Sequence, residues 1–366
     1  MSLKAGIVGL PNVGKSTLFN AITKKHILAA NYPFATIEPN VGVVTVPDTR
    51  LDYLANLYNP KSVVPTTFEF IDIAGLVSGA SKGEGLGNKF LSHIRDVDCI
   101  VEVVRCFNDA NITHVEGSPN PVRDVEIINT ELVLADLETV VTRLSKIEKK
   151  AETSKDKLAI FEVNTLKIVK ESLEKGIPIR LVDFTEEEIK LLKTFNFITS
   201  KKVIYVANVD EISASVGDND YSLELKKFAE SDGASVIVMC CKLESELADM
   251  DDNEKNLFLQ ELGIANSGLD KLIFATYNLL NLATFFTSGT DECRAWTFRM
   301  GMKAPECAGI IHTDFERGFI KAEVMSFDDL KQAGNELKVK ENGKLRLEGK
   351  DYQMQDGDIC YFRFNV

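Results

Sequence analysis

One stretch near the N-terminus constrains the fold of this chain more than any other. Residues 4–22 read KAGIVGLPNVGKSTLFNAI, which is a short apolar strand, a glycine-containing loop and the start of a helix. Gly9 to Ser16 fit the P-loop pattern G-x-x-x-x-G-K-S/T, in the strand-loop-helix context that this motif requires. Such a loop wraps its amides around phosphate, and the helix N-terminus faces the same anion. The sequence therefore predicts an α/β P-loop domain with a doubly wound, mostly parallel sheet.

The P-loop assigns roles to individual residues. Lys15 is expected to pair with the β and γ phosphate oxygens and to support hydrolysis, and Ser16 is expected to offer its hydroxyl to Mg²⁺. The residues of this motif expected to contact the nucleotide are Gly9, Asn12, Val13, Gly14, Lys15, Ser16 and Thr17. A glycine-rich turn that binds nothing is the alternative, but the strand, the loop, the Lys-Ser pair and the helix together argue against it.

A second apolar strand supplies a carboxylate. The stretch TFEFIDIAG ends in Asp72 and Gly75. P-loop enzymes use an acidic residue at such a strand end to position the metal, so we expect Asp72 in the Mg²⁺ site. Gly75 is expected to approach the γ-phosphate through its backbone amide. Thr36, in the intervening segment ATIEPN, is a candidate second hydroxyl for Mg²⁺ when that loop closes.

The usual water-orienting residue is replaced in this chain. A Ras-like protein carries glutamine after the Asp-x-x-Gly motif, but here the residue is Leu76, which forms no side-chain hydrogen bond. His114 lies in the polar loop NDANITHVEGSPNPVRD, directly after the apolar strand DCIVEVVRC. Ligands bind at such strand ends in parallel sheets. From the residues alone, a water-orienting His114 and a solvated loop histidine remain equal alternatives.

The segment VANVDE, residues 206–211, lies where a P-loop GTPase carries the base-reading sequence Asn-Lys-x-Asp. Guanine presents two donors that the aspartate accepts together, whereas adenine presents neither. Glu211 is one methylene longer than aspartate, and Val209 lacks the lysine stem that covers the base. Asn208 could pair with N6 and N7 of adenine. The segment therefore favours ATP over GTP.

A later strand, ASVIVMCC, leads to the slot of the last base-contacting loop. It places Lys242 in that slot and the thiol of Cys240 close to the nucleotide. The alternative for Cys240 is a small buried apolar side chain, which is the more frequent fate of a free cysteine.

Taken together, these motifs resemble a known family. GLPNVGKST, DIAGLVSGASKGEGLGNKFLSHIRDVD and NVDE are similar to the Obg-like ATPases of the YchF subfamily, and AGIIHTDFERGFIKAEV with DGDICYFRFNV is similar to its C-terminal TGS domain. In that subfamily a hydrophobic residue, matched here by Leu76, replaces the glutamine, and a histidine matching His114 is its proposed substitute. The resemblance also implies association with the ribosome, through ribosomal RNA and protein, and a link to translation and stress regulation.

Asn12 raises the possibility of a second cation. Its amide oxygen can face the phosphate side of the loop, where K⁺ would supply the positive charge that an arginine finger brings elsewhere. P-loop proteins that resemble this one, lack the glutamine and carry asparagine at this position are potassium-activated. The alternative is that Asn12 only accommodates a tight turn.

Three domains are predicted along the chain. Residues 1–130 and 200–280 form the P-loop domain. Residues 131–199 form an inserted antiparallel helical hairpin, because apolar residues recur at helical spacing on both sides of the polar break KKAETSKDK. Residues 281–366 form a β-grasp TGS domain, in which short β-like runs surround a helix that Ser326 caps.

Composition narrows the function classes. A net charge of −13 and a pI near 5.0 argue against DNA and against non-specific coating of nucleic acid, although a local basic patch could bind RNA. No run is apolar enough to span a membrane, and no signal peptide pattern is present, so we expect a cytoplasmic protein, and a monomer. The seven cysteines form no CxxC pair, which favours free thiols.

Two other functions stay open at this point. An Obg-type GTPase acting in ribosome assembly would use the same P-loop but would bind GTP instead of ATP. A nucleotide-stabilised scaffold without turnover would follow if no residue took over the role of the missing glutamine.

Overall fold

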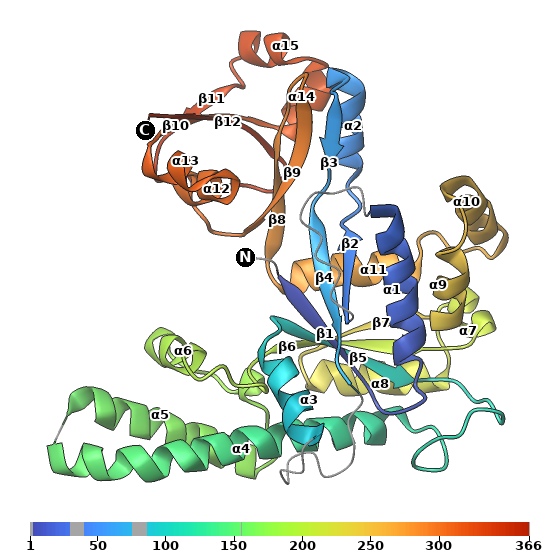
Figure 1. The fold of residues 1–366 in the computed structure, drawn as a ribbon, viewed down its shortest axis with the longest axis vertical. Coiled ribbons are helices and arrows are strands. Elements are labelled where there is room, and N and C mark those ends of the chain that lie inside the picture. The colour runs from blue at the N-terminus through green and yellow to red at the C-terminus, as the bar shows by residue number, and fades with distance from the viewer. Residues whose placement is uncertain (1–2, 30–39, 75–85, 155, 366) are drawn as a thin grey trace. The chain divides into compact units, whose positions relative to one another are not determined.

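The computed structural model describes residues 3–29, 40–74, 86–154 and 156–365. The chain divides into two compact units, one formed by Met1–Val44 with Glu69–Leu272 and the other by Thr45–Phe68 with Ile273–Val366. Both combine helices with a sheet (Figure 1), so the predicted α/β class is confirmed. The two units are described separately below.

The described part of the first unit contains a six-stranded sheet in the order β2-β4-β1-β5-β6-β7. Its strands are β1 (Lys4–Val8), β2 (Val41–Thr45), β4 (Thr67–Asp72), β5 (Cys99–Arg105), β6 (Lys202–Asn208) and β7 (Ser235–Met239). β4, β1, β5, β6 and β7 run parallel, each paired with the next. Because the chain places β4 on one side of β1 and β5 on the other, the sheet is doubly wound as predicted, and its carboxyl edge is the expected ligand site.

The register aligns the strand ends that carry the predicted motifs. Ile7 is paired with Asp72, Arg105 with Asn208, and Asn208 with Met239. Residues far apart in the sequence therefore meet at one edge of the sheet. Every residue of β5 is buried, and almost every residue of β6, as expected for central strands covered on both faces.

Ten helices and one short 3-10 segment belong to this part of the described chain or extend from it. They are α1 (Lys15–Ala29), α3 (Leu86–Arg95), α4 (Pro121–Ser154), α5 (Lys157–Glu174), η2 (Ile179–Leu181), α6 (Glu186–Lys193), α7 (Glu211–Val216), α8 (Asp220–Ser231), α9 (Cys241–Leu247), α10 (Asp252–Glu261) and α11 (Gly268–Leu279).

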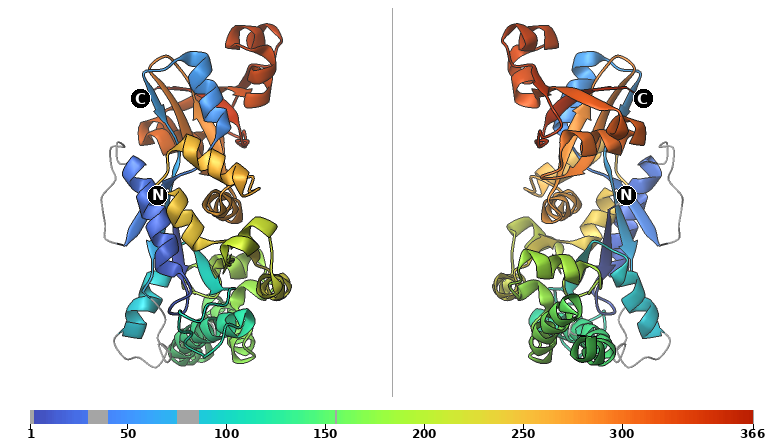
Figure 2. Two further views of the ribbon diagram at one scale, coloured as in Figure 1. Left: turned by 90° about the vertical axis from the view of Figure 1, so that its right-hand side faces the viewer. Right: turned by 90° about the vertical axis from the view of Figure 1, so that its left-hand side faces the viewer.

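Helices α4 and α5 form the predicted antiparallel hairpin. They run side by side in Figure 1 and are seen nearly end-on in Figure 2. Their shared core includes Val140, Leu144, Val163 and Leu166, each less than a tenth exposed. The sequence placed the start of the insertion near residue 131, but α4 begins at Pro121 and continues unbroken through that point. The first turns of the long helix therefore lie next to the P-loop domain rather than in the hairpin.

Capping residues in the sequence mark the starts of two helices. Thr185 caps α6, and the Glu188 carboxylate accepts a hydrogen bond from the Thr185 amide, which completes a capping box. Ser326 accepts a hydrogen bond from the amide of Asp329 at the start of α14 (Phe327–Ala333), as its sequence context indicates.

The described part of the second unit contains a sheet in the order β11-β10-β12-β8-β9-β3. Its strands are β3 (Ser62–Val64), β8 (Leu282–Thr287), β9 (Glu292–Arg299), β10 (Phe319–Ser326), β11 (Arg346–Glu348) and β12 (Asp358–Phe364), and its helices are α2 (Thr49–Tyr58), α12 (Ala304–Ile311), α13 (Thr313–Arg317), α14 and α15 (Glu336–Glu341). The antiparallel β8–β9 hairpin, with β12 parallel to β8, is the arrangement of a β-grasp sheet, as predicted.

The second unit also recruits a segment from the first part of the chain. Residues Thr45–Phe68 supply α2 and β3, and β3 pairs in parallel with β9. Leu51 and Leu54 of α2 pack in the same core as Phe286 and Ile359. The predicted boundaries assigned this segment to the P-loop domain, because local patterns do not indicate which sheet a short strand joins.

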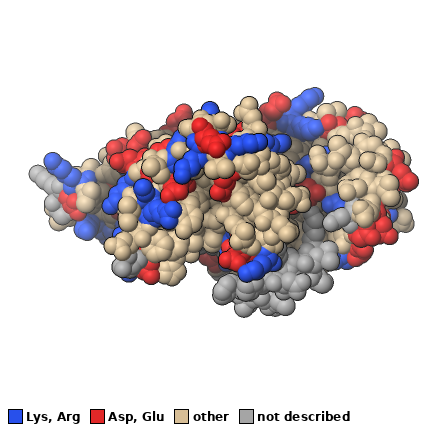
Figure 3. All heavy atoms as spheres, turned by 90° about the horizontal axis from the view of Figure 1, so that it is seen from above, with Lys and Arg blue, Asp and Glu red and all other residues tan. Residues whose placement is uncertain are grey.

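Surface features agree with the composition. Basic and acidic side chains are interspersed over the face drawn in Figure 3. The seven cysteines are buried and free, as expected. None of the helices within the described residues is long and apolar enough to cross a membrane.

Candidate nucleotide-binding site

The P-loop joins β1 to α1 and is built around two left-handed backbone positions. Gly14 has φ +102°, and a Cβ added there would lie 2.2 Å from Nδ2 of Asn208. Asn12 has φ +64°, so it occupies the tight turn that asparagine tolerates. A Cβ on Gly9 would lie 2.7 Å from the carbonyl oxygen of Val103. These two glycines are therefore required by close backbone and side-chain approach.

Lys15, the first residue of α1, forms an ion pair with Asp72 at the end of β4. The cation expected to bind phosphate and the carboxylate expected to act at the metal are thus adjacent. An Asp72 carboxylate and a Ser16 hydroxyl are the hard oxygen donors that Mg²⁺ takes beside substrate phosphates and water, so these residues fit the ion. Within the described residues, no cluster of three or more His, Cys, Asp or Glu side chains could hold a metal alone. Thr36, Gly75 and Leu76 lie outside the described residues.

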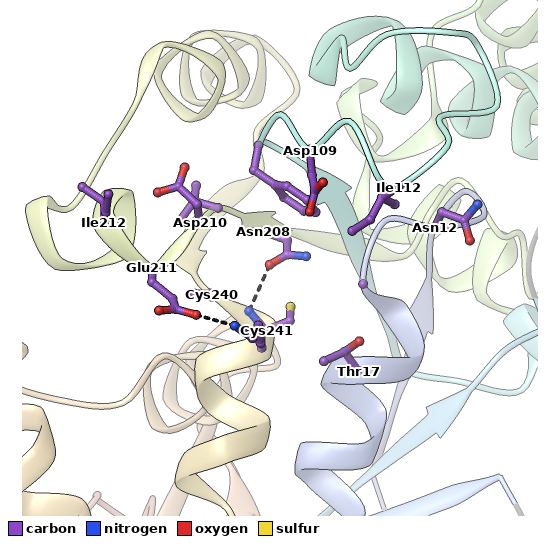
Figure 4. A pocket seen from close by; sticks show the side chains of 14 residues that line it. Asn12, Thr17, Asp109, Ile112, Asn208, Asp210, Glu211, Ile212, Cys240 and Cys241 are labelled. Atoms are coloured by element: carbon purple, nitrogen blue, oxygen red, sulfur yellow. Dashed lines mark hydrogen bonds and ion pairs between the residues drawn. The ribbon is translucent and has the colours of Figure 1, made fainter.

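A cavity of about 680 Å³ opens beside the P-loop at the carboxyl ends of β5, β6 and β7. Figure 4 shows side chains reaching it from the P-loop, from α1, from the loop after β5 and from the starts of α7 and α9. Its lining residues are Asn12, Gly14, Thr17, Phe107, Asp109, Ile112, Asn208, Val209, Asp210, Glu211, Ile212, Cys240, Cys241 and Lys242. Its position, volume and partly apolar lining suit a nucleotide base and ribose.

The lining set contains all of the residues that the sequence assigned to the base, together with some that it missed. The missed residues are Phe107, Asp109, Ile112, Asp210, Ile212 and Cys241. A signal for them did exist, since each lies within a few residues of the end of β5, β6 or β7, where ligands bind in such sheets. Four predicted P-loop residues are not part of this lining: Gly9, Val13, Lys15 and Ser16.

Asn208 connects three of the segments around the cavity. Its Nδ2 donates to the carbonyl of Val13, 2.8 Å away, and its Oδ1 accepts from the amide of Cys241, 2.9 Å away. Figure 4 shows the second of these bonds. Asn208 is 5% exposed. In this structure both ends of the amide are used within the protein, so the predicted pairing with adenine N6 and N7 would require an exchange of partners. Its observed role is to brace the P-loop against β6 and α9.

Glu211 and Lys242 form an ion pair of 2.8 Å across the mouth of the cavity. Both side chains are more than half exposed, and the bond to Glu211 raises the pKa of Lys242. Val209 is buried, and its amide donates to the carbonyl of Met239. The exposed polar groups of the base-reading segment are thus the carboxylates of Asp210 and Glu211 rather than the side chain of Val209.

Cys240 and Cys241 are both buried in the cavity wall. Burial raises the pKa of the Cys240 thiol and raises that of Cys241 well above its usual value, so both are neutral at pH 7. The sulfur of Cys240 accepts a weak hydrogen bond from the amide of Leu243 and caps α9. Cys240 therefore combines both of its predicted features, proximity to the site and burial as a small apolar side chain.

His114 is neither solvated nor in the cavity lining. It is 6% exposed, its Nε2 lies 2.9 Å from Oδ2 of Asp124, and its Nδ1 accepts from the amide of Glu116. Because Nδ1 accepts, Nε2 carries the proton and donates it to the carboxylate. The solvated-loop alternative is therefore wrong. Nothing in this arrangement brings the imidazole to phosphate, since Nε2 is occupied by Asp124 in the first turn of α4 and Nδ1 by the amide of Glu116 in the preceding loop.

The loop that carries His114 still touches the P-loop. Nδ2 of Asn12 donates to the carbonyl of Thr113 at 3.2 Å. Arg123 holds Asp124 from the other side, with Nη2 2.9 Å from Oδ1. The His114 loop is thus connected at one end to the phosphate-binding loop and at the other to the long helix α4.

Comparisons with known proteins cover the whole chain. A family model named for the C-terminal part of YchF GTPases, described as a protein of unknown function, matches residues 282–365, and a model described as a 50S ribosome-binding GTPase matches residues 4–146. The chain is 59% identical over 368 residues to a Bacillus subtilis protein and 50% identical over 366 residues to an Escherichia coli O157:H7 protein, both named ribosome-binding ATPase YchF, with 100% of each chain covered.

Solved structures agree with the sequence comparisons. The Schizosaccharomyces pombe YchF GTPase is 43% identical, with a TM-score of 0.91, and the match covers 99% of this chain and 98% of that one. A GTP-binding protein from Pyrococcus horikoshii is 22% identical, with a TM-score of 0.61 over 99% and 100% of the two chains, and shares the fold. The names of these proteins divide between ATP and GTP, which leaves the base as the open question.

Proposed function

The chain belongs to the YchF family, and on that premise we propose that it is a cytoplasmic, ribosome-associated ATPase that hydrolyses ATP in preference to GTP. The observation that carries the base preference is the segment Asn208–Glu211 at the cavity mouth, where a guanine-reading aspartate and its neighbouring lysine are absent. The curated relatives named for ATP hydrolysis support the same preference.

Hydrogen bonding explains why this segment disfavours guanine. Recognition of guanine requires one carboxylate to accept from N1 and the 2-amino group together. Glu211 starts a helical turn and directs its carboxylate to Lys242, so a guanine would have to break that ion pair to be read. Adenine makes no such demand, and the apolar wall formed by Phe107 and Ile112 covers either base.

ATP should bind more tightly than GTP, by ~1 to 3 kcal/mol if one well-made base contact decides the preference. Competition of each nucleotide against a fluorescent ATP analogue measures the difference directly. Glu211→Asp is the informative variant, because Val209 would still leave the base without a lysine stem, so the shorter carboxylate alone should not restore guanine binding. Equal affinities in the parent protein would reject the proposed base preference.

Hydrolysis is assigned to residues around the phosphates. Lys15 binds the β and γ oxygens, and Ser16, Thr36 and Asp72 would hold Mg²⁺, which neutralises phosphate charge when bound. Lys15 must exchange Asp72 for phosphate on nucleotide binding. His114 is proposed to orient the attacking water after its bond to Asp124 is released, which makes release of the loop part of the catalytic cycle.

We also propose that Asn12 contributes to a K⁺ site beside the phosphates. Its Nδ2 is engaged by Thr113, so its amide oxygen is the atom that can bind a cation. At constant ionic strength, turnover in K⁺ should exceed turnover in Na⁺ several-fold, and Asn12→Ala should remove the difference. Asn20→Ala, on the exposed side of α1, serves as the control. Identical rates in the two salts would exclude the cation site.

A ribosomal partner is proposed from the relatives' names and from local charge. The net charge of −13 disfavours general binding to RNA, so a contact with ribosomal RNA would need a local basic region. The end of the helical hairpin offers Lys146, Lys149, Lys150 and Lys157, interleaved with acidic residues. The chain is proposed to act as a monomer whose domains follow the predicted boundaries, except that Thr45–Phe68 belongs to the second unit and the long helix begins at Pro121.

A further inference from the structure

Arg105, the last residue of β5, is a buried cation that the mechanism above does not use. It is 1% exposed, and among the described residues it forms no ion pair with a carboxylate. Burying a charged group is costly unless its hydrogen bonds are satisfied. An uncharged side chain would have a lower free-energy cost of burial if this position only filled space in the core. The arginine is therefore expected to have a specific task.

All three kinds of guanidinium nitrogen donate to the loop that follows the strand. Nε donates to the carbonyl of Phe107 at 3.2 Å, Nη2 to that of Asp109 at 3.1 Å and Nη1 to that of Ile112 at 3.0 Å. The guanidinium carbon also lies 4.7 Å from the centre of the Phe107 ring. The planar group thus holds three carbonyls of an irregular loop in one arrangement.

The three residues held in this way are the three that this loop contributes to the cavity. In Figure 4, Asp109 and Ile112 reach the cavity from the side opposite Glu211. The space available to a base is therefore bounded by the Arg105-held loop on one side and by the Asn208–Glu211 segment on the other. The phosphate-binding groups come from the P-loop and β4, and none of these three bonds is made to them.

We propose that Arg105 is a positioning residue for the nucleobase. It fixes the wall formed by Phe107, Asp109 and Ile112, and so determines binding of the base without touching the phosphates. The inference rests on the proposed nucleotide site, but it does not depend on which base is preferred. Lysine cannot substitute, because its ammonium is a single point and cannot meet three carbonyls in the plane of a guanidinium.

The test compares a ligand that has a base with one that does not. Full-length Arg105→Lys and Arg105→Gln should bind ATP about ten- to a hundredfold more weakly than the parent, because the wall is displaced. Their affinity for inorganic tripolyphosphate, which occupies only the P-loop, should be unchanged. Isothermal titration with Mg²⁺ present measures both affinities, and the ratio of the two is the readout.

Arg180→Lys is the matched control, because the Arg180 side chain is only 8% exposed but pairs with Asp232 away from the cavity, at 2.7 Å. It should lose stability without any change in the ratio. Equal losses for ATP and tripolyphosphate in the Arg105 variants would overturn the proposal, as would unchanged ATP binding. Failure of both Arg105 variants to fold would also reject it, in favour of a purely structural role. A parent that prefers GTP would contradict the proposed function but leave the ratio test intact.

Discussion

Replacing Lys15 with alanine is expected to reduce affinity for ATP by at least about a hundredfold and to abolish measurable turnover. The physical reason is the role proposed for Lys15, which is to bring the positive side chain of the P-loop to the β and γ oxygens. In the structure its ammonium is held by Asp72, so it is already positioned at the phosphate side of the sheet. Titration of Mg²⁺ATP by calorimetry, together with phosphate release, measures the loss.

Lys24→Ala is the control for this prediction. Lys24 lies on the same helix, α1, and its Nζ pairs with Asp249 at 2.6 Å, so the variant removes an equal charge from a surface ion pair. It should bind ATP normally, since exposed pairs contribute little. Because Lys15→Ala also leaves Asp72 without its partner, melting temperatures of both variants should be compared. Retained ATP affinity in Lys15→Ala would show that the loop binds phosphate through backbone amides alone.

Replacing His114 with alanine is expected to leave ATP affinity unchanged and to lower turnover by about a hundredfold or more. A residue that orients water acts in the transition state, so its loss lowers kcat without weakening ground-state binding. Single-turnover hydrolysis and nucleotide titration on the same preparation separate the two effects. The turnover rate of the parent protein should itself be slow, in the range ~10⁻⁴ to 10⁻² s⁻¹ of P-loop switch proteins that act without an activating partner.

The structure supplies a discriminating control for this second prediction. In the resting arrangement His114 donates to Asp124, so a loss of activity in His114→Ala could reflect damage to the start of α4. Asp124→Asn disturbs the same contact while leaving the imidazole in place. If His114 acts on water, Asp124→Asn should retain turnover; if the pair is only a structural bond, the two variants should lose activity alike. Parent-level turnover in His114→Ala would assign the role to another residue.

Several features of the site and of the fold were predictable because they depend on neighbouring residues in the chain. The P-loop is one: its glycines, Lys15 and Ser16 must be contiguous, since the backbone itself wraps the phosphate. The capping box at Thr185 and Glu188 is another, because its two hydrogen bonds join residues one helical turn apart. For such features the residues that form the sequence pattern are also the residues that interact, so the local sequence is sufficient to predict the contact.

The roles of Asn208, His114 and Arg105 were not predictable in this way. Asn208 donates to a carbonyl 195 residues away, which occupies the amide that the sequence assigned to adenine. His114 pairs with a carboxylate on a helix that begins earlier than the apolar periodicity indicated. In the sequence Arg105 is only the residue at the end of an apolar strand. Its three carbonyl partners are apparent only in the folded loop.

The sequence by itself thus determined the α/β fold class, the family and the P-loop, and it predicted the metal and base motifs. These follow from local backbone geometry and from residue chemistry at fixed spacing. Only the tertiary structure decided which strand ends form the cavity, which polar groups are already occupied within the protein, and that Thr45–Phe68 completes the second sheet. The physical reason is that a buried hydrogen-bond donor takes whichever acceptor the packed fold brings to it, and that choice depends on contacts between residues far apart in the chain.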